Sequence, residues 1–123
     1  MYNKLLNKKA KLALVGLGYV GLPIALEFAK KISVIGFDIN EERLAKMREK
    51  IDPCNELEPK AFENSDIYFT SSVDELREAS FFIVAVPTPI DKFNQPDLKP
   101  LLAASRTVGM ALKMGDYVVY EST

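Results

Sequence analysis

Three glycines at positions 16, 18 and 21 lie in the run LVGLGYVGLP, residues 14–23, with the G-x-G-x-x-G spacing of a phosphate-cradling turn. In such a turn Gly16 would permit a tight bend, Gly18 would let the backbone approach a diphosphate, and Gly21 would let the next helix pack closely on a sheet. The start of that helix would offer unpaired N–H groups and a partial positive charge to the phosphates. We therefore predict a diphosphate site here; a strand–helix turn that binds nothing is the alternative.

An acidic residue follows at the distance that a dinucleotide site requires. Asp38 ends the apolar segment SVIGFD, residues 33–38, seventeen residues after Gly21. A carboxylate at the end of the second strand accepts hydrogen bonds from both hydroxyls of an adenosine ribose and repels a 2′-phosphate, which favours NAD. Arg43 stands close by and could instead pair with the 2′-phosphate of NADP. For Asp38 alone, a helix-capping role is the structural alternative.

The elements that must position these residues alternate along the chain. Apolar runs predict strands over 12–15, 32–37, 67–70, 81–86 and 117–121. Helical spacing predicts four helices. The first covers 19–30, and the second follows an N-cap at Asn40 and carries an apolar stripe of Leu44, Met47 and Ile51. The third lies around 73–78, and the fourth begins near Asp97. The last of these helices should turn one side inward, formed by Leu101, Ala104, Val108, Ala111 and Leu112. The polar segment 51–65 predicts a loop with one helical turn.

This alternation predicts an α/β fold in a single domain over residues 1–123. Right-handed crossovers favour a doubly wound parallel sheet in the Rossmann order 3-2-1-4-5, with helices on both faces. A sixth strand should pair beside YVVYE, residues 117–121, and we expect the chain to stop before it. The apolar edge left by the fifth strand should then pair with a neighbouring molecule or fray.

Composition excludes several other classes of protein. Hydrophobic residues make up 48% of the 123 residues and charged residues 27%, with a net charge of −1, so neither disorder nor binding to nucleic acid or an anionic membrane is expected. No histidine is present, which removes the commonest general base and metal ligand, and we expect no metal site. Lysines precede the uncharged run from Leu12 to Leu26 as in a signal peptide, but glycines and Pro23 interrupt that run. We predict a cytoplasmic protein.

Four motifs together resemble a known family. GLGYVGLP (16–23), VPTPID (86–91), QPDL (95–98) and YEST (120–123) resemble the NAD-binding N-terminal domain of the UDP-glucose/GDP-mannose dehydrogenases, the nucleotide-sugar 6-dehydrogenases. The resemblance runs from Lys11 to Thr123. It implies oxidation of the 6-hydroxyl of a nucleotide-bound sugar to a carboxylate, in two steps that each reduce one NAD.

The resemblance also implies roles for individual residues. Tyr19 and Val20 would contact the pyrophosphate through their backbone, and Asp38 and Arg43 would lie at the adenosine ribose. Residues implied further along the cofactor, towards the nicotinamide and the reacting sugar carbon, are Pro87, Thr88, Ser122 and Thr123, of which Thr123 would assist catalysis. A turn role for Thr88 and a frayed terminus for Ser122 and Thr123 are the structural alternatives.

The resemblance also bears on the sugar substrate and on the covalent step of the reaction. The stretch IDPCNELEP, residues 51–59, resembles the branch acting on UDP-N-acetylglucosamine or UDP-N-acetylgalactosamine in bacterial capsule or O-antigen synthesis, with UDP-glucose as the alternative substrate. The family's cysteine nucleophile lies in a central region beyond the Ser-Thr pair. Cys54 precedes the third strand and is interpreted as an incidental loop thiol. We therefore expect a cofactor domain from a longer, homodimeric or larger enzyme, with no turnover by itself.

Two other functions remain open on the sequence. One is a stand-alone Rossmann module that senses a nucleotide and regulates a partner, which would explain the length of the chain without a missing region. The other is a different hydroxyl dehydrogenase with a similar cofactor domain, of the 6-phosphogluconate or β-hydroxyacid type. The nucleotide-sensing module does not explain VPTPID or the terminal EST.

Overall fold

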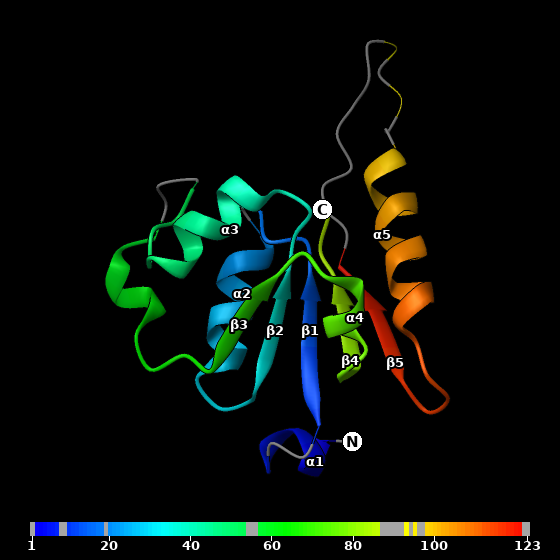
Figure 1. Ribbon diagram of the computed structural model, residues 1–123, viewed down its shortest axis with the longest axis horizontal. Helices are drawn as coiled ribbons and strands as arrows, with labels where there is room; N and C mark the ends of the chain where they lie inside the picture. The colour runs from blue at the N-terminus through cyan, green and yellow to red at the C-terminus, as the bar shows by residue number, and fades with distance from the viewer. Residues whose placement is uncertain are drawn as a thin grey trace.

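The computed structural model describes residues 2–7, 10–18, 20–53, 57–86, 93, 95 and 98–121. Their strands form one parallel sheet in the order β3-β2-β1-β4-β5, which confirms the predicted Rossmann order. All strands end at the edge that faces upward in Figure 1. The strands are β1 (Lys11–Val15), β2 (Val34–Phe37), β3 (Ile67–Thr70), β4 (Ala79–Val84) and β5 (Tyr117–Tyr120).

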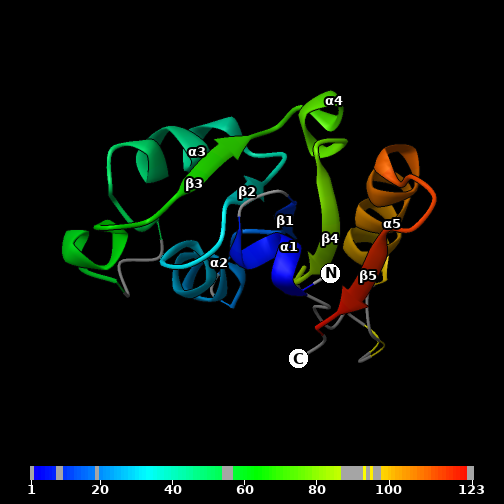
Figure 2. The same cartoon turned by 90° about the horizontal axis from the view of Figure 1, so that it is seen from below.

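Helices cover both faces of this sheet, and Figure 2 shows α2 and α5 on opposite sides of it. The helices are α1 (Tyr2–Leu6), α2 (Gly21–Ala29), α3 (Glu41–Arg48), α4 (Val73–Leu76) and α5 (Lys99–Ala111), with a 3₁₀ turn η1 at Pro59–Phe62. One buried cluster joins the inner sides of α2 and α3 to the sheet, through residues such as Leu22 and Leu44. A second cluster joins α4 and α5 to the other face, around Phe82 and Val108.

Four predicted strands have different limits in the structure, two of them by a single residue: β1 begins at Lys11 rather than at residue 12, and β5 ends at Tyr120 rather than at residue 121. β4 begins two residues earlier than predicted, at Ala79, because it pairs along β1 from Lys11 onward. It ends at Val84, since β1 turns away at Gly16 and Ala85 N–H makes the last bond across, to the Val15 carbonyl at 2.8 Å. β2 begins at Val34 rather than at residue 32. The early end of β4 frees Ala85 and Val86 to line the space above the sheet.

Two residues predicted for helix stripes lie outside the helices. The chain reverses at Lys50, whose φ is 64°, and Ile51 N–H then bonds back to the Lys46 carbonyl, so Ile51 lies beyond α3 with 45% of its surface exposed. Leu112 follows the last residue of α5 in extended conformation and is 42% exposed. Of the other predicted core residues of α5, Ala104, Val108 and Ala111 are buried as expected, and Leu101 is partly buried.

β5 is an edge strand of the described sheet. Its Tyr117 ring stacks on Phe81 of β4 with ring centroids 6.1 Å apart. Tyr117 remains 54% exposed and Val119 41% exposed. The pairing of this edge with a neighbouring molecule stays a prediction.

Candidate functional site

A cleft of about 770 Å³ lies at the carboxyl ends of β1 and β4, where the strand order changes direction. This is the place where open α/β sheets bind ligands, and its size is that of a small-molecule or cofactor site. Most of its lining is apolar. The lining residues are Val15, Gly16, Leu17, Gly18, Val20, Phe37, Asp38, Ile39, Arg43, Ala85, Val86, Pro100, Ala103, Ala104, Thr107 and Glu121.

The fold itself requires two of the three glycines. Gly16 has a φ of 99°, a conformation that side-chain-bearing residues rarely adopt, and a Cβ there would lie 2.8 Å from Val86 Cγ1. A Cβ on Gly21 would lie 1.8 Å from the Gly16 carbonyl oxygen, so no side chain fits where α2 meets the turn. These contacts confirm the tight bend and the close helix packing expected from the spacing.

Gly18 differs from the other two glycines. Its backbone is not in the left-handed region, and a Cβ built there would meet only Arg43 Nη2, at 3.4 Å, which is an ordinary contact. Nothing in the described part of the protein therefore requires a glycine at this position. The open space beside Gly18 belongs to the cleft, so its missing side chain leaves room for a ligand rather than for the protein.

The start of α2 faces the same cleft and no side chain caps it. Leu22 N–H bonds to the Gly18 carbonyl at 3.1 Å and Pro23 has no N–H, so the amides of Val20 and Gly21 are the ones without an acceptor among the described residues. Val20 is the N-cap residue and lines the cleft, and no side chain accepts a hydrogen bond from the first turn of α2. Helix amides without a partner carry a partial positive charge and bind anions. Gly18 and the start of α2 together form a cradle suited to a diphosphate.

Asp38 lies one strand away, at the end of β2, and is 8% exposed. Its Oδ2 accepts a hydrogen bond from Leu17 N–H at 3.0 Å, and its Oδ1 accepts one from Asn40 N–H at 3.0 Å. Helix capping falls to Asn40 instead, whose side chain accepts from Arg43 N–H at 3.1 Å. Asp38 therefore lines the cleft with a fixed carboxylate whose remaining lone pairs can accept hydrogen bonds from ribose hydroxyls.

Arg43 completes the connection between the turn and β2. Its Nη2 donates to the Leu17 carbonyl at 2.9 Å, and its Nη1 lies 3.8 Å from Asp38 Oδ2. Both backbone polar groups of Leu17 are thus bonded by side chains from the segment that follows β2. Because this holds the guanidinium at the glycine turn, Arg43 contributes to the shape of the cleft as well as to its charge.

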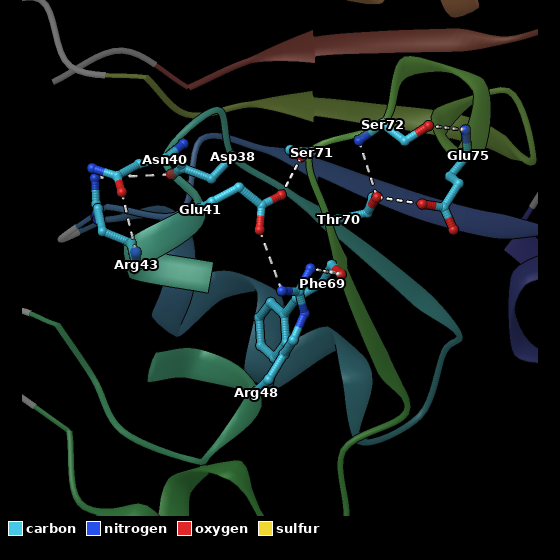
Figure 3. A network of polar contacts seen from close by, with 10 residues as sticks. All are labelled: Asp38, Asn40, Glu41, Arg43, Arg48, Phe69, Thr70, Ser71, Ser72 and Glu75. Atoms are coloured by element: carbon cyan, nitrogen blue, oxygen red, sulfur yellow. Dashed lines mark hydrogen bonds and ion pairs between the residues drawn. The ribbon is translucent and has the colours of Figure 1, made fainter. Parts of the chain in front are cut away.

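A second group of polar contacts, shown in Figure 3, supports the end of β2 from β3. Asp38 N–H bonds to the Thr70 carbonyl at 3.2 Å, the Ser71 hydroxyl donates to Glu41, and Arg48 Nη2 donates to the Phe69 carbonyl at 3.0 Å. Arg48 Nη1 also lies 3.4 Å from Glu41 Oε2. These contacts fasten the start and the end of α3 to β3, and so fix the turn that carries Asp38.

The same contacts shift the protonation of two carboxyl groups. The hydrogen bond from Ser71 holds the pKa of Glu41 below its ordinary value. The hydrogen bonds from Thr70 and then from Tyr68 lower the pKa of Glu75, and the partner Glu75 raises the pKa of the Tyr68 hydroxyl. Glu41 is exposed, Glu75 is half-buried and neither lines the cleft, so their contribution is to local order rather than to a buried reactive centre.

Several predicted site residues lie outside the described residues: Tyr19, Pro87, Thr88, Ser122 and Thr123. Cys54, interpreted as a loop thiol, also lies outside them. Of the predicted residues that the structure describes, it brings Gly16, Gly18, Val20, Asp38 and Arg43 together around one cleft. Gly21 lies directly beneath it, against Gly16. Over the described ranges, no group of three or more histidine, cysteine, aspartate or glutamate residues could hold a metal ion. No helix in those ranges is long and apolar enough to cross a membrane.

One wall of the cleft was not predicted from the sequence. α5 contributes Pro100, Ala103, Ala104 and Thr107, which recur at helical spacing and are small. This run of small residues on one helix face could have indicated a wall of the cleft, because small side chains leave space beside a ligand. The other unassigned polar residue is Glu121, which follows β5 and lines the cleft across the sheet from Asp38.

Comparison with known proteins decides the family. The model of the NAD binding domain of the UDP-glucose/GDP-mannose dehydrogenase family matches residues 10–123. The chain belongs to this family. It is an NAD-binding Rossmann domain of the nucleotide-sugar dehydrogenases, and NAD is its cofactor, as the glycine turn and Asp38 predicted.

Individual relatives agree with this assignment. The chain is 52% identical over 117 residues, 94% of its length, to UDP-N-acetyl-D-glucosamine 6-dehydrogenase of Pseudomonas aeruginosa, and covers 28% of that protein. It is 53% identical over 112 residues, 91% of its length, to Protein CapL of Staphylococcus aureus, and covers 26% of it. The solved structure of UDP-D-ManNAc dehydrogenase from Pyrococcus horikoshii matches with a TM-score of 0.82 at 33% identity, covering 92% of this chain and 28% of that one. The chain thus spans 26% to 28% of the length of these relatives.

The described residues fit NAD. Uncapped amides at α2 and the open side of Gly18 suit the diphosphate, and the carboxylate of Asp38 suits an unphosphorylated adenosine ribose. Arg43 does not reverse this choice for NAD, because its guanidinium already bonds the Leu17 carbonyl and lies beside Asp38.

Proposed function

We propose that this chain is the cofactor domain of an NAD-dependent dehydrogenase that oxidises the C6 hydroxyl of a UDP-N-acetylhexosamine to a carboxylate. Support comes from relatives at 47% to 53% identity, two of which are named as UDP-N-acetyl-D-glucosamine 6-dehydrogenases. The reaction would serve synthesis of a bacterial surface polysaccharide in the cytoplasm. The rest of the catalytic machinery, including a cysteine nucleophile, would belong to a longer protein that assembles as a dimer or larger oligomer.

The observation that carries the proposal is the glycine at position 18. The described part of the fold accommodates a side chain there, with Arg43 Nη2 as its one near neighbour, at 3.4 Å. Its absence is explained by a ligand that approaches the backbone closely, beside amides that favour a diphosphate. The open position supports a bound dinucleotide, and the relatives named above support a dehydrogenase over a nucleotide-sensing module.

Each described residue of the site would contribute to holding the cofactor. The amides at the start of α2 would bind the diphosphate, and Asp38 would accept the hydroxyls of the adenosine ribose. NAD, when bound, supplies the acceptor for the hydride that leaves C6 of the sugar. Apolar Val86 and the small residues of α5 would exclude water from the cleft, which lengthens the life of a bound, reactive cofactor.

Residues outside the described ranges complete the proposal on the strength of the family resemblance. Tyr19 would present its backbone to the diphosphate, and Pro87 and Thr88 would lie along the cofactor beyond β4. Ser122 and Thr123 would lie near the nicotinamide, with Thr123 assisting at the reacting carbon.

Two measurements test the proposal. In calorimetry the chain should bind NAD more tightly than NADP and should bind UDP-sugars very weakly. Mixed with NAD and UDP-N-acetylglucosamine, UDP-N-acetylgalactosamine or UDP-glucose, the chain alone should form no NADH, whereas the product of the complete gene should form two NADH per N-acetylated sugar. Turnover by the chain alone would contradict its role as a cofactor domain. A complete gene product that oxidises only UDP-glucose would contradict the substrate.

A further inference from the structure

Glu121 is an acidic side chain of the cleft to which neither the sequence motifs nor the family resemblance gives a role. It directly follows β5, and its backbone N–H bonds to the Val84 carbonyl at 2.8 Å, which fixes its position at the end of the sheet. Among the described residues that line the cleft, only Asp38, Arg43 and Glu121 carry a charge. Glu121 therefore supplies the negative charge on the β5 side of the cleft.

The two carboxylates lie at unequal distances from the glycine turn. β2, which ends at Asp38, is the direct neighbour of β1, whereas β4 separates β1 from β5 and Glu121. With about 4.8 Å between neighbouring strands, Asp38 stands about 5 Å to one side of the turn and Glu121 about 10 Å to the other. A diphosphate at the turn would thus place one ribose beside Asp38 and the base of the other nucleoside near Glu121.

The bonding of the two carboxylates also differs. Asp38 is fixed by Leu17 and Asn40 N–H groups, an arrangement suited to directional hydrogen bonds with a diol. The Glu121 side chain has no hydrogen bond or ion pair with any residue in the described ranges, and it is exposed. A carboxylate of this kind acts on a ligand through its charge rather than through a fixed geometry.

We propose that Glu121 makes the cleft distinguish oxidised from reduced cofactor, an inference that rests on the NAD-binding function proposed above. The nicotinamide ring of NAD⁺ carries a positive charge and that of NADH does not. A carboxylate on the nicotinamide side attracts the oxidised ring and leaves the reduced ring unaffected. The Glu121 carboxylate therefore favours binding of NAD⁺ and release of NADH. A reaction that uses two NAD molecules in succession needs this exchange twice.

The test is the ratio of the dissociation constants of NADH and NAD⁺, measured by calorimetry for the chain and for Glu121→Gln. The substitution keeps the shape of the side chain and removes its charge. We expect NAD⁺ affinity to fall about threefold to tenfold, as for a unit charge interaction at partly solvated distance, with NADH affinity unchanged. ADP, which lacks the nicotinamide nucleoside, should bind both proteins equally. Raising the salt concentration should lower the wild-type ratio towards that of the variant.

A matched control is Glu63→Gln, which makes the same change of charge at an exposed residue beyond η1, outside the cleft. It should leave the ratio unchanged. Equal weakening of NAD⁺ and NADH by Glu121→Gln, or no change in either, would overturn the inference while leaving the NAD site intact. A wild-type chain that binds neither ADP nor NAD⁺ would instead overturn the proposed function.

Discussion

Replacing Gly18 with alanine separates the needs of the ligand from those of the fold. The added methyl group would lie 3.4 Å from Arg43 Nη2 and near no other described atom outside its own chain neighbours. Because Gly18 does not have a positive φ, alanine can adopt its conformation and also restricts the unfolded chain. We expect the free energy of unfolding of Gly18→Ala to stay within about 1 kcal/mol of wild type.

NAD binding should respond very differently to the same methyl group. It occupies the space through which a diphosphate would reach the uncapped amides of α2. Losing one hydrogen bond to a charged group costs about 1.5–3 kcal/mol, which corresponds to a loss of affinity of about 10- to 150-fold. Calorimetry with NAD and with ADP should show similar losses, since the two ligands share the diphosphate.

Two further alanine variants serve as controls in the same assays. A Cβ on Gly109, within α5, has no neighbour within 4 Å, so Gly109→Ala should bind NAD normally and be slightly more stable. Gly21→Ala should be destabilised by about 1–3 kcal/mol or more, because its Cβ would lie 1.8 Å from the Gly16 carbonyl oxygen. If Gly18→Ala binds NAD within a factor of two of wild type while folded, the cradle is wrongly assigned. If it unfolds as Gly21→Ala does, Gly18 is needed by the fold and loses its value as evidence for a ligand.

The remaining predictions concern cofactor choice and pH. Asp38→Ala should weaken NAD binding about 10- to 100-fold through loss of a charge-assisted hydrogen bond, and unchanged affinity in calorimetry would remove the ribose role. Asp38→Ser should raise the affinity for NADP relative to NAD, because it removes the charge that repels the 2′-phosphate and leaves Arg43; a constant ratio in the same titrations would contradict this. The lowered pKa of Glu75, caused by Thr70 and Tyr68, means that its ionised form is favoured in the folded state. The ionised Glu75 carboxylate should stabilise the folded state fully above the ordinary pKa of 4.5. This stabilisation should be lost as the pH falls through the folded-state pKa of Glu75. Urea unfolding of Glu75→Gln should therefore be less sensitive to pH than that of wild type below pH 4.5 and equally sensitive near neutrality, and parallel curves would refute the assignment.

Local sequence was sufficient for the centre of the site. The spacing of Gly16, Gly18 and Gly21 depends on a single turn, and Asp38 follows at the end of the adjacent strand, so both could be predicted without knowledge of distant contacts. The strand order followed from the alternation of elements and the handedness of crossovers. The positive φ of Gly16 and the close approach of Gly21 to it confirm that reasoning.

Contacts between distant segments could not be predicted in this way. Ser71 and Glu41 are thirty positions apart and make their hydrogen bond only because β3 pairs with β2. In the same way, the wall of the cleft formed by Ala103 and Thr107 depends on where α5 packs against β4. The limits of β4 were wrong because they are set by its pairing with β1, whereas apolar composition continues to Val86.

The contacts around Leu17 explain why the ribose site and the diphosphate site must form together. Its N–H is bonded by Asp38 and its carbonyl by Arg43, so the second βα unit holds the phosphate turn of the first. A turn held only by its own glycines would lose more conformational freedom when it binds, because glycine is the most flexible residue. Here that cost is met during folding, so the proposed diphosphate site would present amides that are already held in place. Because of the same connection, a change at Asp38 should also loosen the turn, so its effect on affinity should extend to the diphosphate. Gly18, which no side chain bonds, is therefore the cleaner place to test the site.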